Sequence, residues 1–285
     1  NINAKVGDRV VVYKTFDNYG SDEMQLQYYI SDVDKRIELY IMGIGFIVLV
    51  LLIARKNGLK ALFALIVTIA FIIKIFIPAI YSGYSPILFA IITAVFSSLV
   101  TIYFTVGMNK KFVVALLGVT SGVLIAGILS YIFTYTMRLN GFLDSDLLSC
   151  AYLLKKIKIK ELIPAGVIIG SLGAVMDVAV SITSSINELH EANPNISKKS
   201  MFKSAINIGN DIIGTMINTL ILAYIASSIF TLLLIYIQAN EYPLIRILNF
   251  QDIAVEIMRS VCGSIGILIS VPLTAYIGTL IYKKK

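Results

Sequence analysis

The sequence predicts an all-α polytopic membrane protein with about seven transmembrane helices, preceded by a small partial β segment outside the membrane. Of its 285 residues, 58% are hydrophobic and only 14% are charged, whereas about a quarter are charged in a typical soluble domain. Apolar runs recur along the chain, each long enough to cross a hydrocarbon core about 30 Å thick. A membrane β-barrel would instead alternate over segments of about ten residues, a pattern that this sequence lacks.

Residues 1–36 show the patterning of β-strands. The stretches 7–16 and 24–32 are rich in β-branched and aromatic residues, and turn-forming residues separate them. Every second residue from Leu26 to Ile30 is large and apolar, as in a strand with one buried face. Two strands are too few to be stable alone, so we expect the remnant of a larger extracytoplasmic β module; a disordered leader is the alternative. Because the chain begins with Asn1, we also expect a fragment or a processed form.

The rest of the chain, residues 37–285, is predicted to form one helical membrane domain with seven spans. The spans cover about residues 37–54, 59–80, 86–107, 113–136, 162–186, 205–237 and 253–281. We expect the first turns of the long sixth span to lie at the membrane interface or in a polar cavity.

Lys and Arg residues predict the orientation of these spans in the cell membrane. They gather in the loops near 55–60, 110–111 and 198–203 and in the tail 283–285, which the seven spans place on one side. Excess Lys and Arg marks cytoplasmic loops, so the C-terminus is expected in the cytoplasm and the β segment outside. The segment 137–161 carries four lysines on the opposite side. It is either an amphipathic helix on the outer surface or evidence of a miscounted span, and its side stays open.

Several classes of enzyme and cofactor site have no signature in the sequence. One histidine and two separated cysteines do not form a zinc site, and neither a P-loop nor a GxSxG motif occurs. The net charge of +7 follows from the basic cytoplasmic loops and does not indicate nucleic acid. We therefore predict no cofactor, no metal and no catalytic residue, and a protein that is not an enzyme.

The fifth span carries Asp177 in its middle. An ionised carboxylate at that depth costs about 2.5–3.5 kcal/mol on insertion scales. Gly170, Gly173, Ser181 and Ser184 share its helix face, since they follow at steps of three or four residues. Small residues on such a face allow a second helix to approach closely.

The sixth span has a matching polar face that includes Asn207, Asp211 and Asn218. Asp177 and Asp211 lie equally far on either side of Pro194 in the connecting loop, so an antiparallel hairpin would bring both carboxylates to a similar depth. The predicted ion- or substrate-binding residues are Asp177, Asp211, Asn207, Asn210, Asn218, Ser181, Thr215 and Arg259. The alternative is that these polar residues only hold helices together.

Small residues also mark faces of the fourth and seventh spans. In the seventh span one face carries Arg259, Gly263, Gly266, Ser270 and Thr274. Arg259 is expected near the outer end of the span, where it either extends to the membrane surface or neutralises a carboxylate such as Glu256. In the fourth span, the close-packing positions are Gly118, Gly122 and Gly127.

Three stretches carry a family resemblance: "AGVIIGSLGAVMDVAVSITSSINEL" at 165–189, "NPNISKKSMFKSAINIGNDIIGTMINTLILAYI" at 193–225 and "AVEIMRSVCGSIGILISVPLTAYI" at 254–277. Together with "VGDRVVV" and "ARKNGLKAL", they resemble the YibE/F family of bacterial membrane proteins. The resemblance implies a multi-span protein of the cell membrane with an extracytoplasmic β module after a first helix, and the chain departs from that pattern by lacking the first helix and the early strands.

Three functions fit these observations. The first is a secondary transporter or permease that uses an intramembrane carboxylate site, because such carboxylates mark ion and proton relays. The second is a non-catalytic assembly or receptor protein. The third is an intramembrane aspartyl protease with Asp177 and Asp211 as a dyad, although the expected GxGD motif is missing. The expected partners are the lipid bilayer, a small solute or ion, and a second copy or a related membrane protein.

Overall fold

The structure, a computed structural model, describes residues 4–17, 25–141, 156–238 and 243–282. Contacts between residues divide the chain into two compact units, Asn1–Leu62 and Phe63–Lys285. We call them the N-terminal unit and the bundle unit and describe each by itself.

The N-terminal unit begins with an antiparallel hairpin of β1 (Val10–Asp17) and β2 (Gln25–Val33). Tyr13 lies opposite Tyr29, and their rings stack with centroids 5.5 Å apart. The two predicted strands are thus confirmed, while most of the predicted turn lies outside the described residues. The expected buried face is not found in this ribbon, because Leu26, Tyr28 and Ile30 are all exposed.

The next element, α1 (Arg36–Phe71), continues through the π-helix η1 (Ile72–Phe76) into α2 (Ile77–Tyr81). These 46 residues form one candidate span, yet a straight helix of that length would measure about 69 Å, more than twice the thickness of the hydrocarbon core. The backbone is non-helical at Arg55, with φ 47° and ψ −129°. A Cβ atom at Gly58 would lie 2.8 Å from Val50 Cγ1, although residues eight apart in a continuous helix are separated by about 12 Å.

The chain therefore folds back at Arg55, as predicted between the first and second spans. Six helices of the described residues are long and apolar enough to cross a membrane. Because the first of them contains this reversal, the fold agrees with about seven spans.

The bundle unit contains five further long helices, and all but α7 begin and end within about six residues of a predicted span. They are α3 (Pro86–Val106), α4 (Lys110–Thr136), α6 (Ile159–Ala192), α7 (Lys198–Ser227) and α10 (Gln251–Tyr282). Three of them begin at side chains that cap the free backbone amides: Ser85 accepts from Leu88 N, Asn109 from Phe112 N and Ser197 from Ser200 N.

The predicted sixth span, 205–237, is in fact two helices, α7 and α8 (Ile229–Gln238). They are separated at Ser228, whose amide bonds to the carbonyls of both Tyr224 and Ile225. The hydroxyl of Ser227 donates to the carbonyl of Tyr224, and such a bond competes with the helical ladder. A short helix, α9 (Leu244–Leu248), follows α8.

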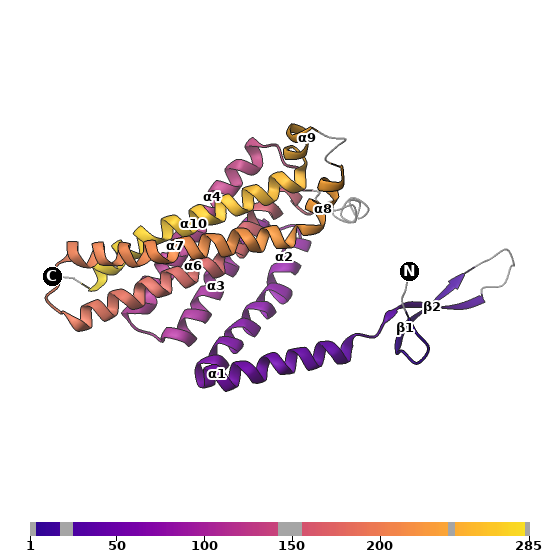
Figure 1. Cartoon of the computed structure of the whole chain (residues 1–285), viewed down its shortest axis with the longest axis horizontal. Helices are drawn as coiled ribbons and strands as arrows, with labels where there is room; N and C mark the ends of the chain where they lie inside the picture. The colour runs from indigo at the N-terminus through magenta and orange to yellow at the C-terminus, as the bar shows by residue number, and fades with distance from the viewer. Residues whose placement is uncertain (1–3, 18–24, 142–155, 239–242, 283–285) are drawn as a thin grey trace. The chain divides into compact units, whose positions relative to one another are not determined.

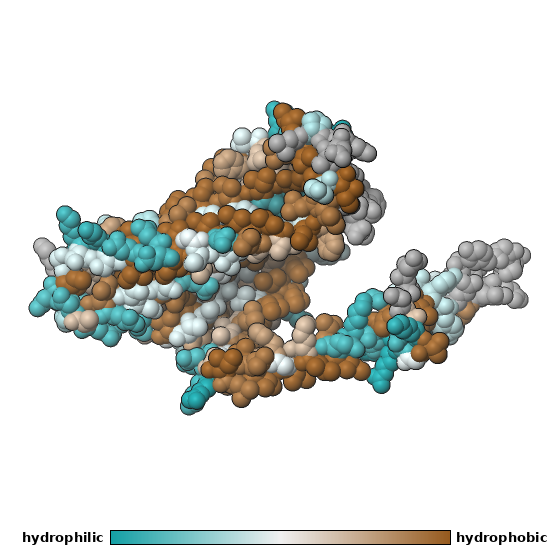
Figure 2. Space-filling model, in the orientation of Figure 1, coloured by the Kyte–Doolittle hydropathy of each residue, from teal (hydrophilic) through white to brown (hydrophobic). Residues whose placement is uncertain are grey.

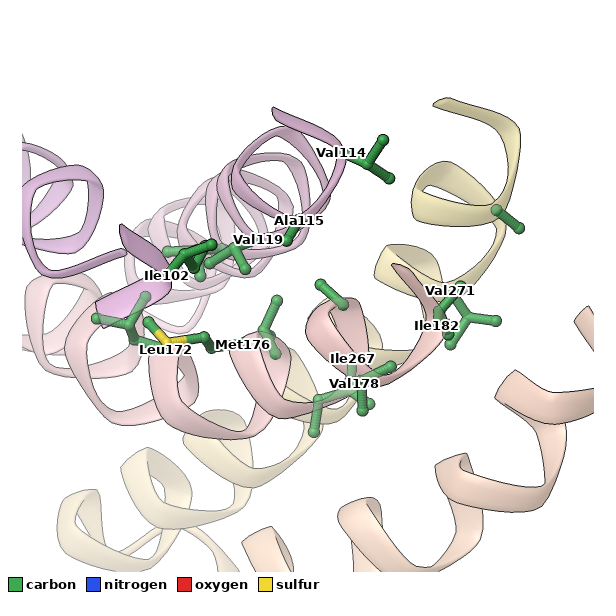
Figure 3. Packing of buried hydrophobic residues seen from close by; sticks show 14 of the residues in the cluster. Ile102, Val114, Ala115, Val119, Leu172, Met176, Val178, Ile182, Ile267 and Val271 are labelled. Carbon is green, nitrogen blue, oxygen red and sulfur yellow. The ribbon is translucent and has the colours of Figure 1, made fainter. Parts of the chain in front are cut away.

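Helix α6 lies at the centre of the bundle unit and packs against α3, α4, α7 and α10 (Figure 1). Side chains from α3, α4, α6 and α10 point into a shared hydrophobic core, as shown in Figure 3 for Ile102, Val119, Leu172, Val178 and Ile267. This core fixes the position of α6 relative to its neighbours.

Glycines allow the closest helix contacts in this core. A Cβ atom at Gly122 of α4 would lie 2.7 Å from Val175 of α6 and 2.8 Å from Ser270 of α10. A Cβ atom at Gly266 of α10 would lie 2.9 Å from the carbonyl oxygen of Gly122. The predicted close packing at Gly118 and Gly127 is likewise confirmed, against Thr274 and Ile168. Such small-residue contacts stabilise helix pairs in a bilayer, where burial of apolar surface adds little.

We expect Gly122→Ala to lower the free energy of unfolding by about 1–3 kcal/mol, because the added methyl group has no free space and forces helices apart. The matched control is Gly45→Ala in α1, where a Cβ atom would meet no atom within 4 Å; it should be neutral or slightly stabilising. Denaturation of the purified protein in detergent measures both changes. Equal stability of the two variants would contradict the close packing of α4 on α10.

Candidate functional site

A line of exposed small and polar residues runs along α6. Between Ile163 and Ser184, all other residues of this central helix are buried or half-buried by the protein. The exposed residues, which we call the α6 stripe, are Gly166, Gly170, Gly173, Asp177 and Ser181. Steps of three and four residues place them on one face. A helix surface that faces acyl chains carries large apolar side chains, so the composition of this stripe indicates water or another polypeptide as its neighbour.

Asp177 lies near the middle of the 34-residue helix α6, far from both of its ends. Its side chain is exposed, and a Cβ atom at neighbouring Gly173 would meet no atom within 4 Å. Among the hydrogen bonds and ion pairs of the described residues, none involves the carboxylate of Asp177. This carboxylate is therefore free to bind a proton, a cation or a donor group that approaches along the stripe.

Two contacts fix how α7 runs beside the stripe. A Cβ atom at Gly170 would lie 2.6 Å from the hydroxyl oxygen of Tyr224, and one at Gly209 would lie 3.3 Å from Ile182. Asp177 lies between the two α6 residues, so the α7 segment between Gly209 and Tyr224 runs past it. That segment holds four of the predicted site residues, Asn210, Asp211, Thr215 and Asn218, and Asn207 lies just before it. Figure 2 shows hydrophilic residues gathered at the end of the bundle unit where α6 ends and α7 begins, and continuing along the first part of α7.

The predicted α7 residues are all exposed, namely Asn207, Asn210, Asp211, Thr215 and Asn218. Asp211 follows Gly209 by two residues, which is about 200° around a helix, so it lies away from the side that contacts Val271 of α10. The hydroxyl of Thr215 donates to the carbonyl of Ile212 in its own helix. No contact between Asp177 and Asp211 is found in the described parts of the chain, and their pairing at equal depth stays a prediction.

Arg259 belongs to a second polar region, at the end of the bundle unit where α6 and α10 begin. Its Nη1 donates to Glu256 Oε1 at 2.8 Å, and both side chains are about a quarter exposed, at 23% and 24%. The expected neutralisation of Arg259 by Glu256 is thus confirmed. A Cβ atom at Gly166 would lie 3.6 Å from Arg259 Nη2, so Arg259 lies against the first residue of the α6 stripe.

A pocket of about 440 Å³ adjoins this ion pair, between the end of α7, α8 and the start of α10. Tyr224, Glu256 and Arg259 all line it. Sequence reasoning did not select Tyr224, because a tyrosine near the end of an apolar span is typical of a membrane interface. Glu256 and Arg259, opposite charges three residues apart in an apolar helix, were the available signal for this pocket.

A sequence profile described as "YibE/F-like protein" matches residues 42–284 of the chain. No curated protein and no solved structure shows significant similarity to it. The matched range contains every long helix apart from the first residues of α1, and it includes the α6 stripe and the pocket. The chain, a membrane protein with several spanning helices, therefore belongs to the YibE/F-like protein family.

Proposed function

We propose that the protein is a secondary transporter or permease of the cell membrane, in which Asp177 binds a coupling ion or a polar solute. The observation that carries this proposal is the α6 stripe: a carboxylate without a partner, midway along a spanning helix, on a face otherwise made of glycine and serine. Intramembrane carboxylates of this kind mark ion and proton pathways.

The absence of large side chains on the stripe supports a path for water or solute. Gly166, Gly170 and Gly173 leave only backbone on the α6 side, and Asp177 and Ser181 continue the same line. Backbone and small polar groups at membrane depth are stable where they face a water-filled cavity or protein. A water-filled stripe would give Asp177 access to protons or cations and allow their release.

The arrangement supports a transporter over an aspartyl protease. A protease dyad needs two carboxylates in hydrogen-bond contact that share one proton. Asp211 lies on the side of α7 away from its contact with α10, and no such contact with Asp177 is found within the described residues.

The second candidate is a non-catalytic assembly protein, favoured by one observation. Helix α7 is little buried: in its most apolar stretch of 18 residues, only 11% of the residues are buried by the rest of the protein. Its exposed residues include Asn207, Asp211 and Asn218. A second copy or a related membrane protein that covers this face would shield these polar side chains from lipid.

Access of water to the stripe can be measured with cysteines. In a chain whose Cys150 and Cys262 are replaced by alanine, we expect Gly173→Cys and Ser181→Cys to react at least tenfold faster with a small, charged thiosulfonate than Ile128→Cys. The reagent attacks the thiolate, which forms only in water, whereas Ile128 is an exposed apolar residue of α4. Slow reaction at both stripe positions together with disulfide-linked dimers at residue 173 would favour the assembly protein instead.

Asp177→Asn should abolish ion-coupled flux while the protein still folds. The amide keeps the shape of the side chain but cannot bind a proton or cation reversibly at neutral pH. We expect flux of protons, sodium or potassium into proteoliposomes, followed with ion-sensitive dyes, to fall at least tenfold, with unfolding in detergent unchanged. The matched control is Asp8→Asn, outside the predicted spans. Unchanged flux in Asp177→Asn would reject the coupling site, and a stability loss confined to Asp177→Leu would indicate a packing role.

The proposed orientation places the end of the bundle with α9 outside the cell and the loop between α6 and α7 in the cytoplasm, following the distribution of Lys and Arg. Single cysteines at Tyr84 and Asn249 should then react with an impermeant reagent added to intact cells. Cysteines at Asn109 and Asn195 should react only after the membrane is opened. Labelling of Asn249→Cys from inside alone would reverse this orientation.

A further inference from the structure

The pocket beside Arg259 and Glu256 contains charged groups whose bonding is incomplete. The ion pair uses one guanidinium nitrogen and one carboxylate oxygen. Arg259 Nε and Glu256 Oε2 are buried and have no hydrogen-bond partner. A buried polar atom without a partner is unfavourable. Arg259 Nε can therefore donate one further hydrogen bond, and Glu256 Oε2 can accept one.

A third group at the same place is the hydroxyl of Tyr224, which is also buried without a partner. It reaches across from α7 to Gly170, one helical turn beyond the Gly166 position that Arg259 approaches. Tyr224 thus lies against Gly170 and Arg259 against Gly166, on the same face of α6. A Cβ atom at Gly170 would force the hydroxyl of Tyr224 to move, whereas one at Gly166 would make an ordinary contact with Arg259.

The other residues that line the pocket indicate the chemical class of its ligand. The pocket also contains Asp252 and the hydroxyls of Ser227, Ser228, Thr231 and Ser260, with a minority of apolar side chains. Its volume of about 440 Å³ is within the range of small-molecule sites. A simple anion would meet the carboxylate of Glu256, and a simple cation would meet the guanidinium of Arg259.

We propose that this pocket is a binding site for a small zwitterion, whose anionic group binds Arg259 and Tyr224 and whose ammonium group binds Glu256. Binding in this way requires side-chain rotations about the existing ion pair that turn the unused atoms toward the ligand. Both a free amino acid and the ethanolamine headgroup of a phospholipid have this chemistry. The inference goes beyond the proposed transport function, since binding is measured without a gradient and does not involve Asp177.

The test uses the whole chain, purified in detergent and freed of lipid, with binding followed by thermal unfolding at increasing probe concentration. The zwitterionic probes are the neutral L-amino acids, tested singly, glycerophosphoethanolamine and dihexanoyl phosphatidylethanolamine. Acetate, inorganic phosphate and ethylammonium are the probes of single charge sign. We expect saturable stabilisation by at least one zwitterion at a concentration at least tenfold lower than for any singly charged probe. Binding of amino acids identifies a free solute, and binding of the two ethanolamine compounds alone identifies a lipid headgroup.

Variants connect the binding to the ion pair. Arg259→Gln should weaken zwitterion binding at least tenfold. Since Arg259→Gln leaves Glu256 buried without its partner, the double variant Glu256→Gln/Arg259→Gln removes both charges and avoids an unpaired one; it should fold and also lose binding. Lys74→Gln, which removes one exposed cation away from the pocket, should bind as the natural chain does.

Three results would overturn the proposal: no saturable binding of any zwitterion, equal binding of a singly charged probe, or unchanged binding in the folded double variant. Each leaves the transport function standing if Asp177-dependent flux persists. Conversely, if Asp177→Asn loses flux but still binds zwitterions, the coupling site at Asp177 and the zwitterion pocket are two separate sites.

Discussion

Close contact between glycines and small side chains of α4, α6 and α10 determines how the bundle unit is built. Gly122 and Gly266 bring α4 and α10 to backbone contact, and Val175 of α6 fills the space beside Gly122. With its neighbours this close, α6 is enclosed by α3, α4, α7 and α10. Enclosure on these sides leaves a single narrow line of α6 uncovered. The position of Asp177 on that line thus follows from packing contacts several residues away.

The glycines of the bundle unit fall into two groups, those buried between helices and those on the uncovered line of α6. Gly122 and Gly266 are buried in helix contacts, where an added methyl group would meet neighbouring atoms. Gly173 is exposed, and an added methyl group there would meet nothing. Packing therefore does not require glycine at residue 173, whereas the path proposed beside Asp177 would require a small residue there. The same residue type serves two different physical requirements on one bundle.

Much of the fold could be predicted from the sequence because hydrophobic length and basic loops are strong signals in membrane proteins. The reversal at Arg55 was expected from the basic residues around it, and the two strands from their β-branched composition. The break at Ser228 was not, since two serines in an apolar run carry little signal until their hydroxyls have defined acceptors. Helical spacing correctly placed Asp177, Gly170 and Ser181 on one face. It gave no information on how α7 is rotated, and hence none on the direction of Asp211.

The rotation of α7 determines which groups the stripe meets. Tyr224 reaches Gly170 while Arg259 reaches Gly166, so one end of the stripe adjoins the zwitterion pocket proposed above. From Gly166 to Asp177 the helix rises by about 17 Å, and only Gly170 and Gly173 lie between on that face. A solute released from the pocket would thus meet the side chain of Tyr224 at Gly170 before it reached the carboxylate. If both proposals hold, the zwitterion pocket and the ion-coupling carboxylate lie on the same face of α6. The hydroxyl of Tyr224, at Gly170, then lies between the pocket and Asp177.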